Sequence, residues 1–301
     1  MNLEDLRDLW LTYQSVVGFI GINGLLALSV YATLSCGQLS LANAGFMALG
    51  GYTGALLTLH AHLPFPLVLA AGTLVPAVVA VPLGLPVLRL RGVFLAIATI
   101  GWGEVVRLAL VNWDYTNGAL GLVAIPQRAG PVTIYACVAL ACFVLWRLRG
   151  SKTGYALESI RQDEPAARTM GIDTTAHKLA MFVLGAALAG LAGALEAHIS
   201  FMVAPSGYGF ARVVDMLVYA VVGGIASVLG PVLGAAFLTL LPEVLRELSR
   251  VTGLEPGPLR LFVNGLVLLL VIIFLPNGIV SLPGRVREWR EERRVRDAPL
   301  A

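Results

Sequence analysis

The chain has 301 residues, of which 57% are hydrophobic and only 13% are charged, and its formal net charge is +3. Soluble domains carry about 25% charged residues, so this composition excludes an ordinary soluble fold. No Asp, Glu, Lys or Arg occurs between Leu9 and Leu88, a stretch long enough for several membrane spans of about 20 residues each. The sequence therefore predicts an all-α fold, a polytopic bundle of transmembrane helices.

Charge-poor segments predict about nine spans, several of them broken by Gly or Pro. They lie at 16–34, 40–60, 65–88, 92–112, 131–148, 178–200, 213–229, 232–246 and 260–277. The predicted transmembrane domain covers 1–283, and 284–301 is a charged tail. Because Arg and Lys near span ends mark the cytoplasmic side, the basic loop 149–177 and the C-terminus are expected in the cytoplasm. Arg246, Arg250 and Arg260 disagree, since this count places their loop outside.

Two segments rich in small residues, 36–55 and 220–237, are candidates for a translocation path. We expect interruptions at Gly50-Gly51 and at Gly230-Pro231. Broken helices expose backbone polar groups, which membrane proteins tolerate only inside protein or beside a watery cavity. The alternative is plain close packing of helices through small residues. The candidate path residues are Gln38, Ser40, Asn43, Gly50, Gly51, Gly223 and Gly224.

Two charge pairs at i,i+3 spacing fall inside predicted spans. They are Glu104 with Arg107 and Arg212 with Asp215, and each pair shares one helix face. Ionisable groups at membrane depth tend to be functional, but pairs near a span end serve as structural devices. Both interpretations stay open for these intramembrane ion pairs.

Motifs for catalysis are absent from the sequence. No GxxxxGK[ST] phosphate loop, HExxH or GxSxG occurs, and the three cysteines and four histidines show no metal-ligand spacing. We therefore expect neither an enzyme, a metal site nor a nucleotide site on this chain.

The charged stretch at the middle of the chain predicts two short helices. The first covers 154–162, and Asp163 caps the second, which holds Pro165 in its first turn and ends at Gly171. Glu164 and Arg168 are expected to pair at i,i+4 on the outer face, while Ala166 and Ala167 leave one face flat. Such a helix suits a groove in another protein; the alternative is an ordinary solvated loop.

The residues from Glu164 through Ala166 and Ala167 to Gly171 resemble the EAA coupling-loop motif of ABC importer permeases, although Pro165 splits the motif. Four further stretches resemble the LivM-type permease family of branched-chain amino-acid ABC importers, in the same order along 20–283. They are GQLSLANAGFMALGGYTGALL, LRGVFLAIATIGWGEVVRLAL, VVGGIASVLGPVLGA and FLPNGIV.

The resemblance implies a pore-forming subunit in the inner membrane of a prokaryote. It implies a second permease subunit as partner, in a heterodimer, two cytoplasmic subunits that bind the ATP, and an extracytoplasmic solute-binding protein. Neither a cofactor on this chain nor a nucleic acid is implied. The alternative function is an ion-coupled secondary transporter, which would usually need a carboxylate or His relay that the charge-free first third lacks.

Overall fold

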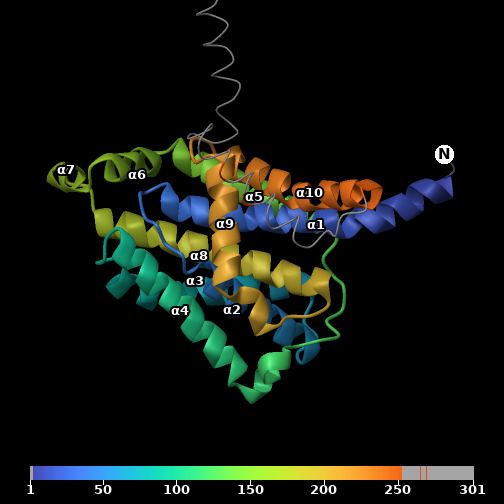
Figure 1. The fold of residues 1–301 in the computed structure, drawn as a ribbon. Helices are drawn as coiled ribbons and strands as arrows, with labels where there is room; N and C mark the ends of the chain where they lie inside the picture. The colour runs from blue at the N-terminus through green and yellow to red at the C-terminus, as the bar shows by residue number, and fades with distance from the viewer. Residues whose placement is uncertain (1–2, 253–264, 266–268, 270–301) are drawn as a thin grey trace, which may run out of the picture.

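The computed structural model describes residues 3–252, 265 and 269, with side-chain surroundings described at 14–243, 265 and 269. Every named element in this part is helical, and a lone bridge joins Leu122 to Val203. The α-helices are α1 (Leu3–Leu34), α2 (Asn43–Leu59), α3 (Phe65–Val87), α4 (Val93–Val111), α5 (Pro131–Arg149), α6 (Lys152–Gln162), α7 (Glu164–Thr169), α8 (Thr174–Ser200), α9 (Phe210–Gly223) and α10 (Leu229–Thr252) (Figure 1).

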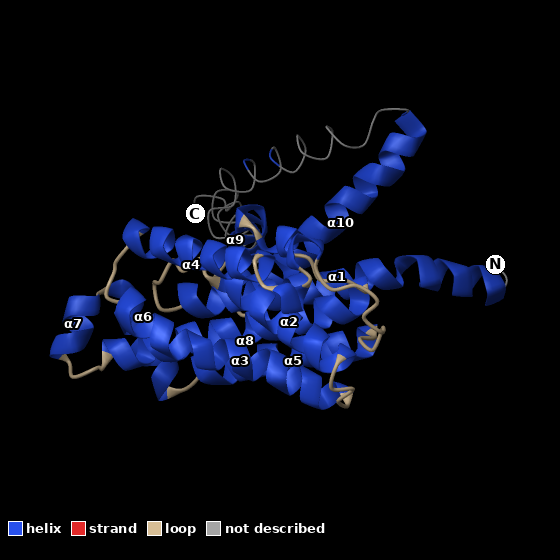
Figure 2. Cartoon of the chain, turned by 90° about the horizontal axis from the view of Figure 1, so that it is seen from below, coloured by secondary structure: helices blue, strands red, loops and turns tan. Residues whose placement is uncertain are grey.

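The core of the bundle is a close packing of α2 and α3 against α8, with α1 beside them. Small residues make this possible: a Cβ on Gly50 would collide with the backbone of Gly190, and one on Gly72 would collide with the Ala194 side chain. Packing through such positions lets membrane helices approach closely without a hydrophobic driving force. The last turns of α10 extend beyond this bundle (Figure 2).

Contacts between loops sort the bundle into two ends. At the end we call the loop end, Arg91 faces Glu164, the segment after α1 touches α6, and Arg149 donates a hydrogen bond to the Ala226 carbonyl. At the opposite, far end, the 60–64 and 113–130 loops meet, and Arg128 donates to the Leu63 carbonyl. The short helices α6 and α7 project from the loop end (Figure 1).

Five described helices are long and apolar enough to cross a membrane. They are Gln14–Leu34, Phe65–Val87, Val93–Val111, Pro131–Arg149 and Thr174–Ser200. The all-helical prediction is confirmed for the described residues, but the count of nine is not. Two of the other predicted spans correspond to helices of 17 and 14 residues, the predicted 232–246 span falls in α10, and the ninth, 260–277, lies outside the described residues.

The two predicted interruptions are wrong in position. The α2 helix runs unbroken through Gly50 and Gly51, because these glycines are contact points with α8 rather than breaks. Gly230 and Pro231 lie in the first turn of α10, where the missing N–H of a proline does no harm. The non-helical stretches are instead 35–42, between α1 and α2, and 224–228, between α9 and α10.

Candidate functional site

The loop between α5 and α8 follows the local signals in its sequence. Its first predicted helix is confirmed as α6, and the Asp163 side chain accepts a hydrogen bond of 3.0 Å from the Ala166 N–H, which caps α7. Pro165 occupies the first turn of α7, and Asp173 caps α8 by accepting from the Ala176 N–H at 3.0 Å. These caps satisfy free N–H groups at both helix starts.

Gly171 ends α7 in a left-handed conformation, with φ of +82°. The Ile172 N–H bonds to the Ala167 carbonyl at 3.1 Å, and the Gly171 N–H bonds to the Arg168 carbonyl at 3.0 Å. This pair of bonds is the Schellman arrangement, which needs a positive φ at the residue after the cap. A Cβ on Gly171 would meet no atom within 4 Å, so the backbone conformation alone requires glycine.

On the coupling role that the resemblance of this loop implies, Gly171→Val should lower solute uptake about tenfold while the amount of protein in the membrane is unchanged. A left-handed conformation costs an L-residue about 1–2 kcal/mol, and more with a branched Cβ, so the turn would reorganise and α7 would lose its placement. Gly171→Asn is the matched control, because Asn tolerates this conformation. Equal uptake of a radiolabelled solute by the Val and Asn variants would show that the turn has no role in transport.

Glu164 is the centre of an ion-pair cluster at the loop end. Its carboxylate accepts from Lys178 at 2.6 Å and from Arg168 at 2.8 Å, and Arg91 lies 4.0 Å away. The predicted pair with Arg168 is confirmed. Because the Glu164 side chain is only 15% exposed, the pair does not lie on an outer face. Burial raises the pKa of Glu164. The hydrogen bond from Lys178 and the nearby cations lower the pKa by more than burial raises it, so the net pKa lies below the usual value of a glutamate.

The outward face of α7 is small and partly apolar. Pro165, Ala166 and Thr169 are exposed, and Met170 is 82% exposed just after the helix. The expectation of a shared flat face was wrong for Ala167, which is buried because it faces the body of the protein. The cluster around Glu164 connects the other side of α7 to α8 and to the α3–α4 loop, so the position of the exposed face is fixed relative to the bundle.

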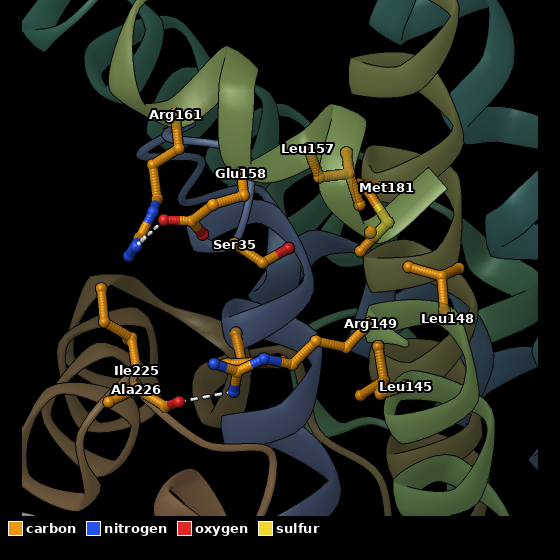
Figure 3. Close-up of a pocket in the computed structure, with 12 residues that line it drawn as sticks. Ser35, Leu145, Leu148, Arg149, Leu157, Glu158, Arg161, Met181, Ile225 and Ala226 are labelled. Carbon is orange, nitrogen blue, oxygen red and sulfur yellow. Dashed lines mark hydrogen bonds and ion pairs between the residues drawn. The ribbon is translucent and has the colours of Figure 1, made fainter. Parts of the chain in front are cut away.

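Behind α6, a cavity of about 60 Å³ lies where α6 meets the ends of other helices (Figure 3). Arg149 crosses it to reach the Ala226 carbonyl, and Glu158 pairs with Arg161 at 2.6 Å on its rim. A Cβ on Gly37 would lie 3.4 Å from Arg161 Cα, so the stretch after α1 also abuts α6. The non-helical stretch 35–42 therefore contacts α6, and the stretch 224–228 contacts the end of α5, where the loop begins.

The uncharged candidates for a translocation path are buried in the 35–42 stretch and at the start of α2. Asn43 donates to Ser29 at 2.8 Å, and Ser40 is buried beside it in sequence. Both polar atoms of the Gln38 side chain are buried with no hydrogen-bond partner among the described residues. The candidate glycines lie elsewhere: Gly50 and Gly51 at the contact with α8, and Gly223 and Gly224 at the end of α9.

One predicted intramembrane pair forms and the other does not. Arg107 donates to Glu104 at 2.7 Å, as expected from their spacing. Arg212 instead donates to both oxygens of Glu196 on α8, at 3.0 and 3.1 Å, and Asp215 is exposed. The predicted Arg212–Asp215 pair is therefore wrong, because the fold brings Glu196 of α8 within hydrogen-bond distance of Arg212.

Comparison with known proteins places this chain in a family. Residues 12–272 match the model described as branched-chain amino acid transport system / permease component. The chain belongs to this permease family. It is 34% identical to the branched-chain amino acid permease protein LivM of Salmonella typhimurium, over 85% of this chain and 67% of the relative.

Two other relatives are more distant permeases. The chain is 28% identical to the autoinducer 2 import permease LsrC of Shigella flexneri, over 67% of this chain and 61% of the relative. It is 31% identical to the branched-chain amino acid permease protein LivH of Escherichia coli K12, over 50% of this chain and 46% of the relative. No solved structure matches the chain.

Sequence reasoning missed two partners in this permease. Lys178 and Arg91 converge on Glu164 from α8 and from the α3–α4 loop. The only signal available was an excess of basic residues near the predicted loop ends, which indicates a side of the membrane but not a partner.

Proposed function

We propose that the chain is the pore-forming permease subunit of an ATP-driven ABC importer that carries branched-chain amino acids or related small solutes. Family membership and the likeness to LivM support this. Within the structure, the observation that carries the proposal is the α6–α7 loop, with its exposed face on α7 and its ion-pair anchor at Glu164. ATP would bind to partner subunits, and this chain would perform no covalent chemistry.

The partners we propose follow from the loop and the relatives. The face of α7 would dock in a groove of a cytoplasmic ATP-binding subunit, through the Glu164–Gly171 region. A second permease would supply the other loop for the second ATPase. LivM and LivH are separately named permeases of high-affinity branched-chain systems, which favours a heterodimer over two copies of this chain. A solute-binding protein would deliver the solute at the far end.

The distribution of charge supports the loop end as the cytoplasmic side. Of the eleven basic side chains that the structure describes, eight belong to the loop end, Arg128 belongs to the far end, and Arg107 and Arg212 lie inside α4 and α9 with carboxylate partners. An excess of Arg and Lys marks the cytoplasmic side of a membrane protein. The eight are Arg89, Arg91, Arg147, Arg149, Lys152, Arg161, Arg168 and Lys178. On this orientation the chain would be a multi-pass protein of a prokaryotic inner membrane, with about nine spans and the tail 284–301 in the cytoplasm.

The contacts of α6 suggest how motion would reach the solute path. When the ATPases close, α7 would be pushed and α6 would move with it. Because α6 touches the 35–42 stretch and Arg149 holds the 224–228 stretch, both non-helical segments would shift together. We propose that the path passes the buried polar groups of Gln38, Ser40 and Asn43. The glycine contacts of α2, including Gly50 and Gly51, would let the helices rock without separating.

Energy coupling distinguishes this proposal from the alternative of an ion-coupled transporter. Leucine uptake by cells that carry the full set of subunits should stop with vanadate, which blocks ABC ATPases, and should persist when an ionophore removes the ion gradients. The opposite pattern would overturn the proposal in favour of secondary transport.

A further inference from the structure

A second pocket lies at the loop end, on the opposite side of α7 from its exposed face. It has a volume of about 390 Å³ and is formed by the last turn of α3, the α3–α4 loop and the α7–α8 corner. We call it the corner pocket. Its lining residues are Leu85, Leu88, Arg89, Arg91, Glu164, Arg168 and Thr175.

The corner pocket carries more positive charge than the chain itself neutralises. Three guanidinium groups and one carboxylate line it, an excess of two positive charges. The two oxygens of Glu164 already accept from Arg168 and Lys178, and Arg91 stays 4.0 Å away with its side chain 67% exposed. Arg89 has no ion pair with any residue that the structure describes. Such a group of arginines matches the geometry and charge of a phosphate.

The other wall of the pocket is apolar. Leu85 and Leu88 belong to the end of α3, a helix long enough to span a membrane, and Leu85 is 51% exposed. Next to them on the same corner, Val93 and Phe94 at the start of α4 are 69% and 73% exposed. Exposed apolar side chains beside a set of cations indicate the boundary between hydrocarbon and water, where lipid tails meet their headgroups.

We propose that the corner pocket binds the phosphate headgroup of an anionic phospholipid through Arg89, Arg91 and Arg168, with an acyl chain against Leu85 and Leu88. A free phosphate ion would use the arginines but leave the leucines uncovered. An acidic protein surface would do the same. The lipid alone satisfies both walls, and basic pockets between membrane helices on the cytoplasmic side are known to take anionic headgroups.

The bound headgroup would also act on the loop. Arg91 and Arg168 face both the pocket and Glu164, so a phosphate between them would tie the α3–α4 loop to α7. The lipid would therefore hold α7 in place on the side opposite its exposed face. Transport would then depend on the anionic lipid content of the bilayer.

The test is native mass spectrometry of the full chain, co-expressed with its partner subunits and purified in detergent. The complex is mixed with phosphatidylglycerol or with phosphatidylcholine of the same acyl chains. We expect phosphatidylglycerol to be retained preferentially, and Arg89→Gln to weaken its retention about fivefold, the effect of one charge near a membrane surface. Lys152→Gln is the matched control, because it removes one exposed charge at the same end but outside the pocket.

Four results would overturn the proposal. The first is equal retention of both lipids, and the second is an equal loss in the Arg89 and Lys152 variants. The third is displacement of phosphatidylglycerol by inorganic phosphate at equal concentration, which would assign the pocket to a free anion. The fourth is loss of ATPase co-purification in Arg89→Gln with lipid retention unchanged, which would make the arginines a protein contact.

Discussion

Leucine uptake should fall roughly a hundredfold in Glu164→Lys, although the subunit still inserts in the membrane. The substitution puts a fourth cation among Arg91, Arg168 and Lys178, and the two closest of these now hold the carboxylate at 2.8 Å and 2.6 Å. Removing one partner of a poorly exposed ion pair costs about 3 kcal/mol or more, enough to detach α7 from its support in most molecules. The measurements are initial uptake rates and the amount of ATPase that co-purifies.

Glu158→Lys is the matched control for this variant. Glu158 lies on the neighbouring helix α6, its side chain is 46% exposed, and its ion pair is with Arg161. An exposed pair of this kind contributes at most about 1 kcal/mol, so uptake should change little. The charge swap Glu164→Lys with Lys178→Glu should recover part of the activity. If Glu164→Lys and Glu158→Lys lower uptake equally, the cluster around Glu164 does not anchor the loop.

Gly50→Leu should prevent the bundle from folding to a stable state. The space in front of Gly50 is filled by the backbone of Gly190, which has no flexible side chain to move aside. The two helices would have to separate, with the loss of contacts along α2, α3 and α8, and overpacking of this kind costs about 3 kcal/mol or more. Heating followed by size-exclusion chromatography in detergent measures the fraction that stays folded.

Gly101→Leu tests whether the effect depends on packing. Gly101 is an exposed position inside α4, where a Cβ would meet nothing within 4 Å. Leu also favours a helix more than Gly does, so this variant should be as stable as the original chain or more stable. A Gly50→Leu protein with unchanged thermal stability would mean that α2 and α8 are not packed backbone to backbone.

The details of the loop were predictable because its signals are local. Asp163, Pro165 and Gly171 each act on backbone groups within about four residues, so their effect can be inferred from neighbouring letters alone. The orientation of Glu164 was not predictable in this way. It depends on Lys178 and Arg91, which reach it only after α7 docks against α8 and the α3–α4 loop.

The small-residue segments show where sequence reasoning was ambiguous. A Gly-Gly pair is consistent with a break or with a close contact, and the choice at Gly50-Gly51 is made by Gly190 and Gly193, far along the chain. The same holds for Arg212: spacing offered Asp215 on its own helix, but packing brought Glu196 within reach from α8. Long-range neighbours decided both positions.

Site-specific crosslinking from α7 in native membranes tests the central claim most directly. In a chain whose native cysteines are replaced by serine, Met170→Cys places a thiol at a position that is 82% exposed on the loop, and Leu120→Cys places one at a 77% exposed position at the far end. A short thiol-reactive crosslinker should capture an ATP-binding subunit from position 170 and none from position 120. Equal capture from both positions, or no capture from position 170 in membranes that transport leucine, would contradict the account.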